Sequence, residues 1–153
     1  MQTLSKSNIL ANKNSMAWII LVIAVALHVA DEEIHDFLPF YNNLVIGLRD
    51  RLGFFPMPTF TFNIWLGGLI GAVIIGGFIT AIVNRGGKRI RIIAIIIGIV
   101  MILNALGHLL GSLFYAHLIP GFWSSFILLP TAVFVVCRGF TGDWQKEITT
   151  SAR

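Results

Sequence analysis

The distribution of apolar and polar residues along the chain predicts four membrane-spanning helices. Three stretches, at 60–83, 92–116 and 120–136, are almost wholly apolar, and a helix needs roughly 20 such residues to cross about 30 Å of hydrocarbon. A further stretch begins at residue 16 and reaches this length only if the helix continues through ionisable residues to His35. We therefore predict spans at about 16–35, 60–83, 92–116 and 120–136, with Pro120 in the first turn of the last span.

The composition supports a membrane protein. Hydrophobic residues make up 56% of the chain and charged residues 12%, whereas soluble domains carry about 25% charged residues. So few charges cannot cover a water-facing surface, which argues against a soluble enzyme or a nucleic-acid binder. The predicted fold class is an all-α, integral membrane four-helix bundle. We expect a single membrane domain at 16–137, flanked by tails at 1–15 and 138–153.

The basic residues predict how the bundle is oriented. Nine of the 11 Lys and Arg residues fall in the two tails and the loop around 84–91, and two fall in the loop at 38–58. Because cytoplasmic segments carry the excess of Lys and Arg, we predict a multi-pass cell-membrane protein with both termini in the cytoplasm. A cleaved signal peptide ending near Ala26 is the alternative interpretation of the first apolar segment, and it would leave three spans.

The loop at 38–58 is long for a simple connection and carries its own helical pattern. Its apolar residues recur at three- and four-residue spacing, which predicts an interfacial helix in this first extracytoplasmic loop; they are Phe40, Tyr41, Leu44, Val45, Leu48 and Leu52. Such a helix either covers the outer ends of the spans as a lid or simply lies among the lipid headgroups.

Polar residues form two stripes that fall near the same, outer membrane face. At about 100° per residue, one stripe lies on the first span and the other on the third. The stripes consist of His28, Asp31, Glu32 and His35, and of Asn104, His108, Gly111 and Tyr115. An unpaired charge in the membrane costs at least about 2.5 to 3.5 kcal/mol, so we expect the two stripes to meet in a polar pocket between these spans.

Several chemistries suit these residue types. Imidazole and carboxylate groups are ligands for Zn²⁺, which keeps an open position in catalytic sites, and also for iron or manganese in helical bundles. Without a metal, His108 and Glu32 could act as an acid and a base. The simplest alternative assigns no chemistry: a solvated helix end at the interface, with Asn104 and His108 as an interhelical hydrogen-bonded pair.

Three short motifs occur in a characteristic order: His28-Val-Ala-Asp31-Glu32, Asn104-Ala-Leu-Gly107-His108 and Pro120-Gly121. In order and spacing they resemble the HXXEE-domain family of small integral membrane proteins, over about residues 16–136. The resemblance implies a suspected enzyme of no established activity. Its motif residues are His28, Asp31, Glu32, Asn104, His108, Pro120 and Gly121.

The chain departs from the family pattern at two positions. Asp31 replaces the first Glu of the H-x-x-E-E motif, and Leu118 replaces the Tyr of a Y-x-P-G motif. His35, Tyr115 and His117 are further candidates from the residues alone.

We expect a metal-dependent membrane enzyme, hydrolase-like, that acts on an amphiphilic or lipid-like substrate on the extracytoplasmic side. A divalent Zn, Fe or Mn ion would be held by His28, Glu32 and His108, with Asp31 and Asn104 also in the catalytic site. The alternative is a proton- or cation-coupled carrier or ligand-binding protein that works as a homodimer, and an assembly or regulatory subunit is a third interpretation. The expected partners are the lipid bilayer and a lipid-like small molecule, and no nucleic acid.

Overall fold

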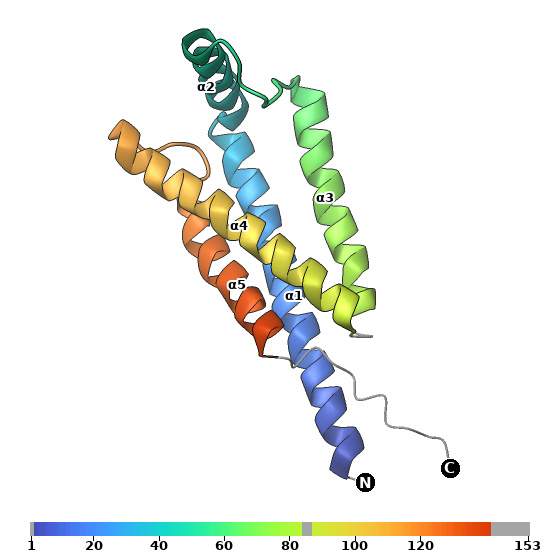
Figure 1. Ribbon diagram of the computed structural model, residues 1–153. Coiled ribbons are helices and arrows are strands. Elements are labelled where there is room, and N and C mark those ends of the chain that lie inside the picture. The colour runs from blue at the N-terminus through green and yellow to red at the C-terminus, as the bar shows by residue number, and fades with distance from the viewer. Residues whose placement is uncertain (1, 84–86, 142–153) are drawn as a thin grey trace.

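The described part of the chain folds as five helices in a computed structural model. The structure describes residues 2–83 and 87–141, with side chains from residue 13 onward, and the helices follow one another as shown in Figure 1. Their bounds are α1 Gln2–Ile34, α2 Phe37–Leu52, α3 Phe62–Val83, α4 Lys88–Tyr115 and α5 Phe122–Phe140. No strand occurs among the described residues. The predicted all-α fold is therefore confirmed.

Four of the helices are long and apolar enough to cross a membrane. They comprise Lys13–Ile34 of α1 and the whole of α3, α4 and α5. Helix α1 continues through Asp31, Glu32 and Glu33 and ends at Ile34, one residue before the predicted end at His35. Its backbone is helical from Gln2, so residues 2–15 of the predicted tail at 1–15 extend this helix. Of the tail predicted at 138–153, residues 142–153 lie outside the described ones.

The core lies where α1, α4 and α5 pack together, with α3 on the other side of α1 (Figure 1). Buried apolar side chains fill this core; they are Ala17, Trp18, Leu21, Ala24, Ala94, Ala105, Leu128, Ala132 and Val135, together with Val83 of α3. Trp18 joins α1 to α3 by donating its indole Nε1–H to the Gly76 carbonyl oxygen, over 2.8 Å. Gly98 allows α4 and α5 to approach closely, because a Cβ there would lie 2.5 Å from Val136.

Helix α2 is the helix predicted in the long loop, and it packs at the end of α1 (Figure 1). The two helices are separated at Asp36, whose φ of 57° is left-handed and interrupts the helical backbone. Tyr41 and Asn42 bind the segment that leads to α3, through the carbonyl oxygens of Pro58 and Phe60. We refer to this end of the molecule as the α2 end of the bundle.

The connection from α4 to α5 differs from its prediction. Pro120 does not lie in the first turn of the last span: α5 begins at Phe122, with Gly121 at its N-cap. That prediction is wrong because Gly121 adopts a φ of 85°, which separates Pro120 from the helix. Residues 116–121 therefore form a loop that turns back over α4 at the α2 end.

Candidate metal centre

Helix α1 carries two ionisable residues one turn apart in its last membrane-spanning turns. His28 and Glu32 are four residues apart, so both side chains lie on the same face of the helix. Both residues are buried, with 2% and 5% of their surface exposed. The Nε2 atom of His28 lies 3.4 Å from Oε1 of Glu32.

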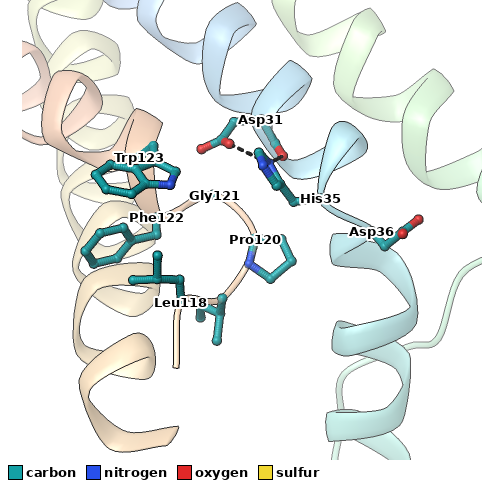
Figure 2. A pocket seen from close by; sticks show the side chains of 9 residues that line it. Asp31, His35, Asp36, Leu118, Pro120, Gly121, Phe122 and Trp123 are labelled. Atoms are coloured by element: carbon teal, nitrogen blue, oxygen red, sulfur yellow. Dashed lines mark hydrogen bonds and ion pairs between the residues drawn. The ribbon is translucent and has the colours of Figure 1, made fainter. Parts of the chain in front are cut away.

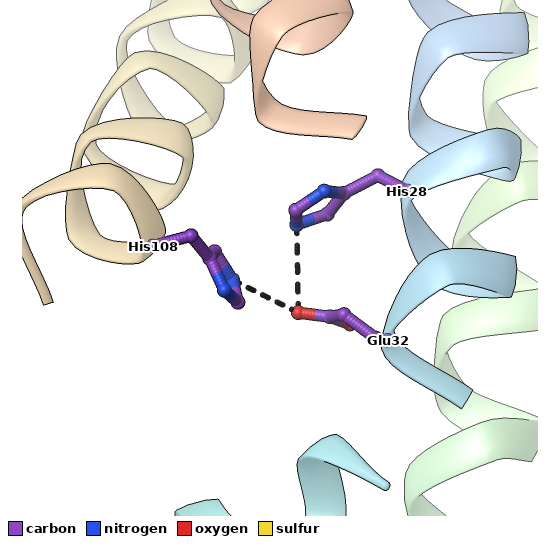
Figure 3. A group of neighbouring side chains, drawn as sticks. All are labelled: His28, Glu32 and His108. Atoms are coloured by element: carbon purple, nitrogen blue, oxygen red, sulfur yellow. Dashed lines mark ion pairs between the residues drawn. The ribbon is translucent and has the colours of Figure 1, made fainter. Parts of the chain in front are cut away.

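Helix α4 brings a second imidazole to the same carboxylate oxygen (Figure 3). The Nε2 atom of His108 lies 3.1 Å from Oε1 of Glu32, and the residue is 3% exposed. The two imidazole rings meet edge to face, with centroids 4.8 Å apart. Phe37, the first residue of α2, lies over His108 at a centroid distance of 5.0 Å. The cluster is thus enclosed by three helices.

The loop at 116–121 fixes the orientation of the His108 ring. Ser112 holds the loop by accepting a hydrogen bond from the Ile119 backbone N–H over 3.0 Å. The next residue, Pro120, presents its carbonyl oxygen 2.5 Å from Nδ1 of His108. Gly121 makes room for the ring, because a Cβ at this position would lie 2.6 Å from the same Nδ1 atom. The Pro120-Gly121 pair therefore holds the His108 ring in its orientation.

The hydrogen bond to Pro120 determines which nitrogen of His108 faces Glu32. A carbonyl oxygen can only accept, so Nδ1 carries the proton, and in the neutral ring Nε2 presents a lone pair. That lone pair faces a carboxylate oxygen across 3.1 Å. Two such atoms repel each other unless a cation lies between them, whether a shared proton or a metal ion.

The two nitrogen-to-oxygen separations also match the spacing of metal ligands. Zinc binds nitrogen and oxygen ligands at about 2.0 to 2.1 Å, which places two ligands of a tetrahedron about 3.3 Å apart. The two nitrogen-to-oxygen distances are 3.1 and 3.4 Å, and all three ligand atoms lie within 4.8 Å of one another. Two imidazoles and a carboxylate fit a divalent cation in charge and in ligand type. We call His28, Glu32 and His108 the candidate metal centre.

His28 has two further polar partners, from two different helices. The amide nitrogen of Asn104, on α4, lies 2.9 Å from Nε2 of His28. The hydroxyl of Ser124, on α5, lies 2.7 Å from Nδ1. Asn104 therefore belongs to the surroundings of the candidate metal centre, next to the nitrogen that faces Glu32.

Asp31 follows a different direction from its neighbour in the sequence. Its Oδ2 atom accepts hydrogen bonds from the backbone N–H of Ser124, over 2.9 Å, and from the Ser124 hydroxyl, over 2.6 Å. Gly121 provides no side-chain cap for α5, so Asp31 caps this helix from α1. The other carboxylate oxygen lies 2.8 Å from Nδ1 of His35, whose side chain is 52% exposed.

Two other candidates from the sequence lie outside the centre. The ring of Tyr115 is packed edge to face on Phe40, with centroids 5.6 Å apart, and it also neighbours His117. The side chain of His117 is exposed and bonds the Leu118 carbonyl oxygen through Nδ1, over 3.3 Å. Leu118, at the position of the family Tyr, is 57% exposed. The polar stripe on α4 thus contributes Asn104 and His108 to the cluster.

A pocket of about 260 Å³ is lined by Asp31, the neighbour of Glu32 in the sequence, and by the Pro120-Gly121 pair (Figure 2). Asp31, His35 and Asp36 contribute its polar wall, and the remaining wall is mainly apolar, from Leu118, Ile119, Pro120, Phe122 and Trp123. This pocket lies between the end of α1 and the beginning of α5.

Sequence reasoning missed Ser112, Ser124 and Phe37. A serine in a transmembrane helix has no distinctive pattern, because it also bonds the carbonyl one turn earlier, as Ser112 does with His108 over 2.8 Å. The Ser124-Ser125 pair after Pro120-Gly121 was the available signal for a helix beginning.

Comparison with known proteins gives one family. A family described as protein of unknown function with HXXEE motif matches residues 18–135. No curated protein and no solved structure matches the chain.

Proposed function

The chain belongs to the HXXEE family, whose function is unknown, and we propose that it is a metal-dependent membrane enzyme that hydrolyses an amphiphilic substrate. The single observation that supports this most is the apposition of two imidazole nitrogens and one carboxylate oxygen at 3.1 and 3.4 Å, in a buried cluster. A divalent cation at this point would relieve the repulsion between the Nε2 lone pair of His108 and the Glu32 oxygen.

The residues would divide the work as follows. His28, Glu32 and His108 would hold the metal, and Asn104 would orient a polar group beside His28. Hydrogen bonds at Nδ1 keep both imidazole rings in place. For His108, the partner is the Pro120 carbonyl oxygen. A divalent metal supplies Lewis-acid chemistry when bound, polarising a carbonyl or phosphoryl oxygen or lowering the pKa of a water molecule.

The substrate class follows from the surroundings of the cluster. The neighbouring pocket combines carboxylates with apolar and aromatic side chains at the α2 end of the bundle, and exposed apolar surface covers the adjacent helices. A molecule that reaches this position along the bilayer would carry an apolar part beside its reacting polar group. Lipid-like esters and amides are of this kind.

The packing favours an enzyme over a carrier. Between His28 and the other end of the bundle, the described part of α1 carries apolar residues that are all 2% exposed or less: Ala24, Leu21, Trp18 and Ala17. They belong to the apolar core that α1 shares with α4 and α5. A carrier needs polar access from both sides of the membrane, whereas a hydrolase needs access from one side.

Metal content tests the proposal. The protein is purified in detergent without chelators and analysed for metals, alongside His108→Ala, Glu32→Gln and the control His117→Ala, which removes an exposed histidine outside the cluster. We expect about one divalent ion per chain in wild type and His117→Ala, and a large loss in the other two variants, because each removes a ligand.

Hydrolysis is measured on the same samples with p-nitrophenyl acyl esters in mixed micelles. Metal-loaded wild type should release p-nitrophenol faster than the chelator-treated protein or Glu32→Gln. Wild type that holds no stoichiometric metal, and whose stability does not respond to added Zn²⁺, Mn²⁺ or Fe²⁺, would contradict metal binding. The cluster would then be an interhelical hydrogen-bonded group that shares a proton.

A further inference from the structure

Ser124 lies between Asp31 of the H-x-x-E-E motif and the imidazole of His28. Its Oγ atom is 2.6 Å from Oδ2 of Asp31 and 2.7 Å from Nδ1 of His28. Ser124 is 7% exposed and His28 is 2% exposed. The three side chains come from two helices, since Ser124 stands in the first turn of α5. They form one continuous hydrogen-bonded chain that ends at the candidate metal centre.

The direction of each hydrogen bond in this chain follows from the chemistry of its ends. A carboxylate can only accept, so the short contact to Asp31 uses the hydroxyl hydrogen of Ser124. The hydroxyl has no second hydrogen, and its oxygen must therefore accept from Nδ1 of His28. This assigns the His28 proton to Nδ1, and the lone pair of Nε2, on the side of Glu32, accepts a hydrogen bond from the Asn104 amide nitrogen over 2.9 Å.

We propose that Ser124 is a positioning residue, which selects the Nδ1–H tautomer of His28 and so aims its Nε2 lone pair at the centre. Asp31 acts through Ser124, because it holds the Ser124 hydroxyl in the donating direction. The expected effect of Ser124 on zinc affinity rests on the proposed metal-binding function. The tautomer itself is a property of the metal-free protein.

The arrangement gives Asp31, the first acid of the motif, a role outside the candidate metal centre. Asp31 does not reach the candidate metal centre, and its Oδ2 atom satisfies both the hydroxyl and the backbone N–H of Ser124. His108 is oriented by a different device, the backbone carbonyl of Pro120. Both imidazoles thus have Nδ1 engaged and Nε2 directed inward, which is the usual arrangement for histidines that bind a metal.

The tautomer can be read directly from the ¹⁵N chemical shifts of the His28 ring in metal-free, ¹⁵N-histidine-labelled protein in detergent micelles. We expect a protonated Nδ1 and an unprotonated Nε2 in wild type. Ser124→Ala should give a mixture of the two tautomers, and Ser124→Thr, which keeps the hydroxyl, should restore the wild-type shifts. An unprotonated Nδ1 in wild type would overturn the proposal without recourse to any variant.

Zinc affinity, measured by competition with a chromogenic chelator, gives the second readout. Ser124→Ala should weaken binding by about 10- to 100-fold, the range found when a partner of a ligating histidine is lost, and Ser124→Thr should recover most of it. Ser125→Ala is the matched control, because Ser125 lies in the same turn and is also buried, but donates to the Gly121 carbonyl oxygen. An equal loss in Ser125→Ala, or an unchanged tautomer in Ser124→Ala, would contradict the positioning role. Wild type that binds no zinc refutes the proposed function alone, since the shifts still decide the tautomer.

Discussion

Gly121→Ala is the most direct test of how the loop at 116–121 supports the candidate metal centre. An alanine Cβ at this position would lie 2.6 Å from Nδ1 and 2.7 Å from Cε1 of His108. Ordinary van der Waals contact begins at 3.4 Å, so the ring or the loop has to move by about 0.8 Å. The backbone adds its own penalty, since the φ of 85° is a conformation that residues with a Cβ rarely adopt.

The energetic cost follows from these two effects. A residue held in a sparsely populated backbone region costs about 1 to 3 kcal/mol. A movement of about 0.8 Å would lengthen the bond from Nδ1 to the Pro120 carbonyl oxygen from 2.5 Å to about 3.3 Å, and an intramolecular hydrogen bond contributes about 1 kcal/mol. We expect the free energy of unfolding to fall by about 2 to 4 kcal/mol. Zinc affinity should fall by about 10- to 100-fold, because His108 loses its orienting partner.

Both quantities can be measured on detergent-solubilised protein, by denaturant unfolding and by zinc competition. Gly107→Ala is a suitable control: it lies next to His108 in the sequence, within α4, and a Cβ there meets nothing within 4 Å. That change should leave zinc affinity unchanged and slightly stabilise the helix. The reasoning is refuted if Gly121→Ala unfolds and binds zinc as wild type does, or if both variants lose affinity equally.

Three further predictions concern the remainder of the bundle. Trp18→Phe removes the 2.8 Å hydrogen bond to the Gly76 carbonyl oxygen of α3 and should lower the free energy of unfolding by about 0.6 kcal/mol, up to about 1.7. Trp123→Phe, at a residue 62% exposed, should change the free energy of unfolding little. Equal effects of the two changes would contradict this prediction. Tyr115→Phe and His117→Ala should both keep wild-type zinc affinity, because neither residue reaches the candidate metal centre, and a tenfold loss in either would place that residue in the site. From the basic residues, labels at both termini should be accessible only from the cytoplasm and a label at Asn42 only from outside; a periplasmic amino terminus would reverse the orientation.

The helical architecture could be predicted from the sequence because membrane spans depend on local composition. A run of about 20 apolar residues has no alternative to a helix in lipid, where each backbone polar group must be satisfied within its own segment. The continuation of α1 to Ile34 was predictable for a related reason: His28 and Glu32 stand at helical spacing in the same apolar run. The periodicity in the long loop likewise predicted α2.

The sequence also places the ionisable groups on one face of each of two spans, and so it predicts the apposition of Glu32 and His108. It did not determine how the stripe on α1 divides. Glu32 turns towards α4 and Asp31 towards α5, while His28 contacts both helices. Successive positions on a helix differ by about 100°, so which neighbouring helix each one meets depends on the packing of α1 against two partners.

Tertiary structure alone decided what Gly121, Ser124 and Ser112 contribute to the site. Gly121 was predicted from the family resemblance, but its contact with the His108 ring depends on the loop returning over α4. Ser112 has no signature, and the Ser124-Ser125 pair signals only a helix beginning, because the importance of Ser124 comes from partners as distant in sequence as His28, 96 positions away. Local pattern reports composition and period, whereas a hydrogen bond between helices requires the crossing positions of those helices, which only the packed bundle defines.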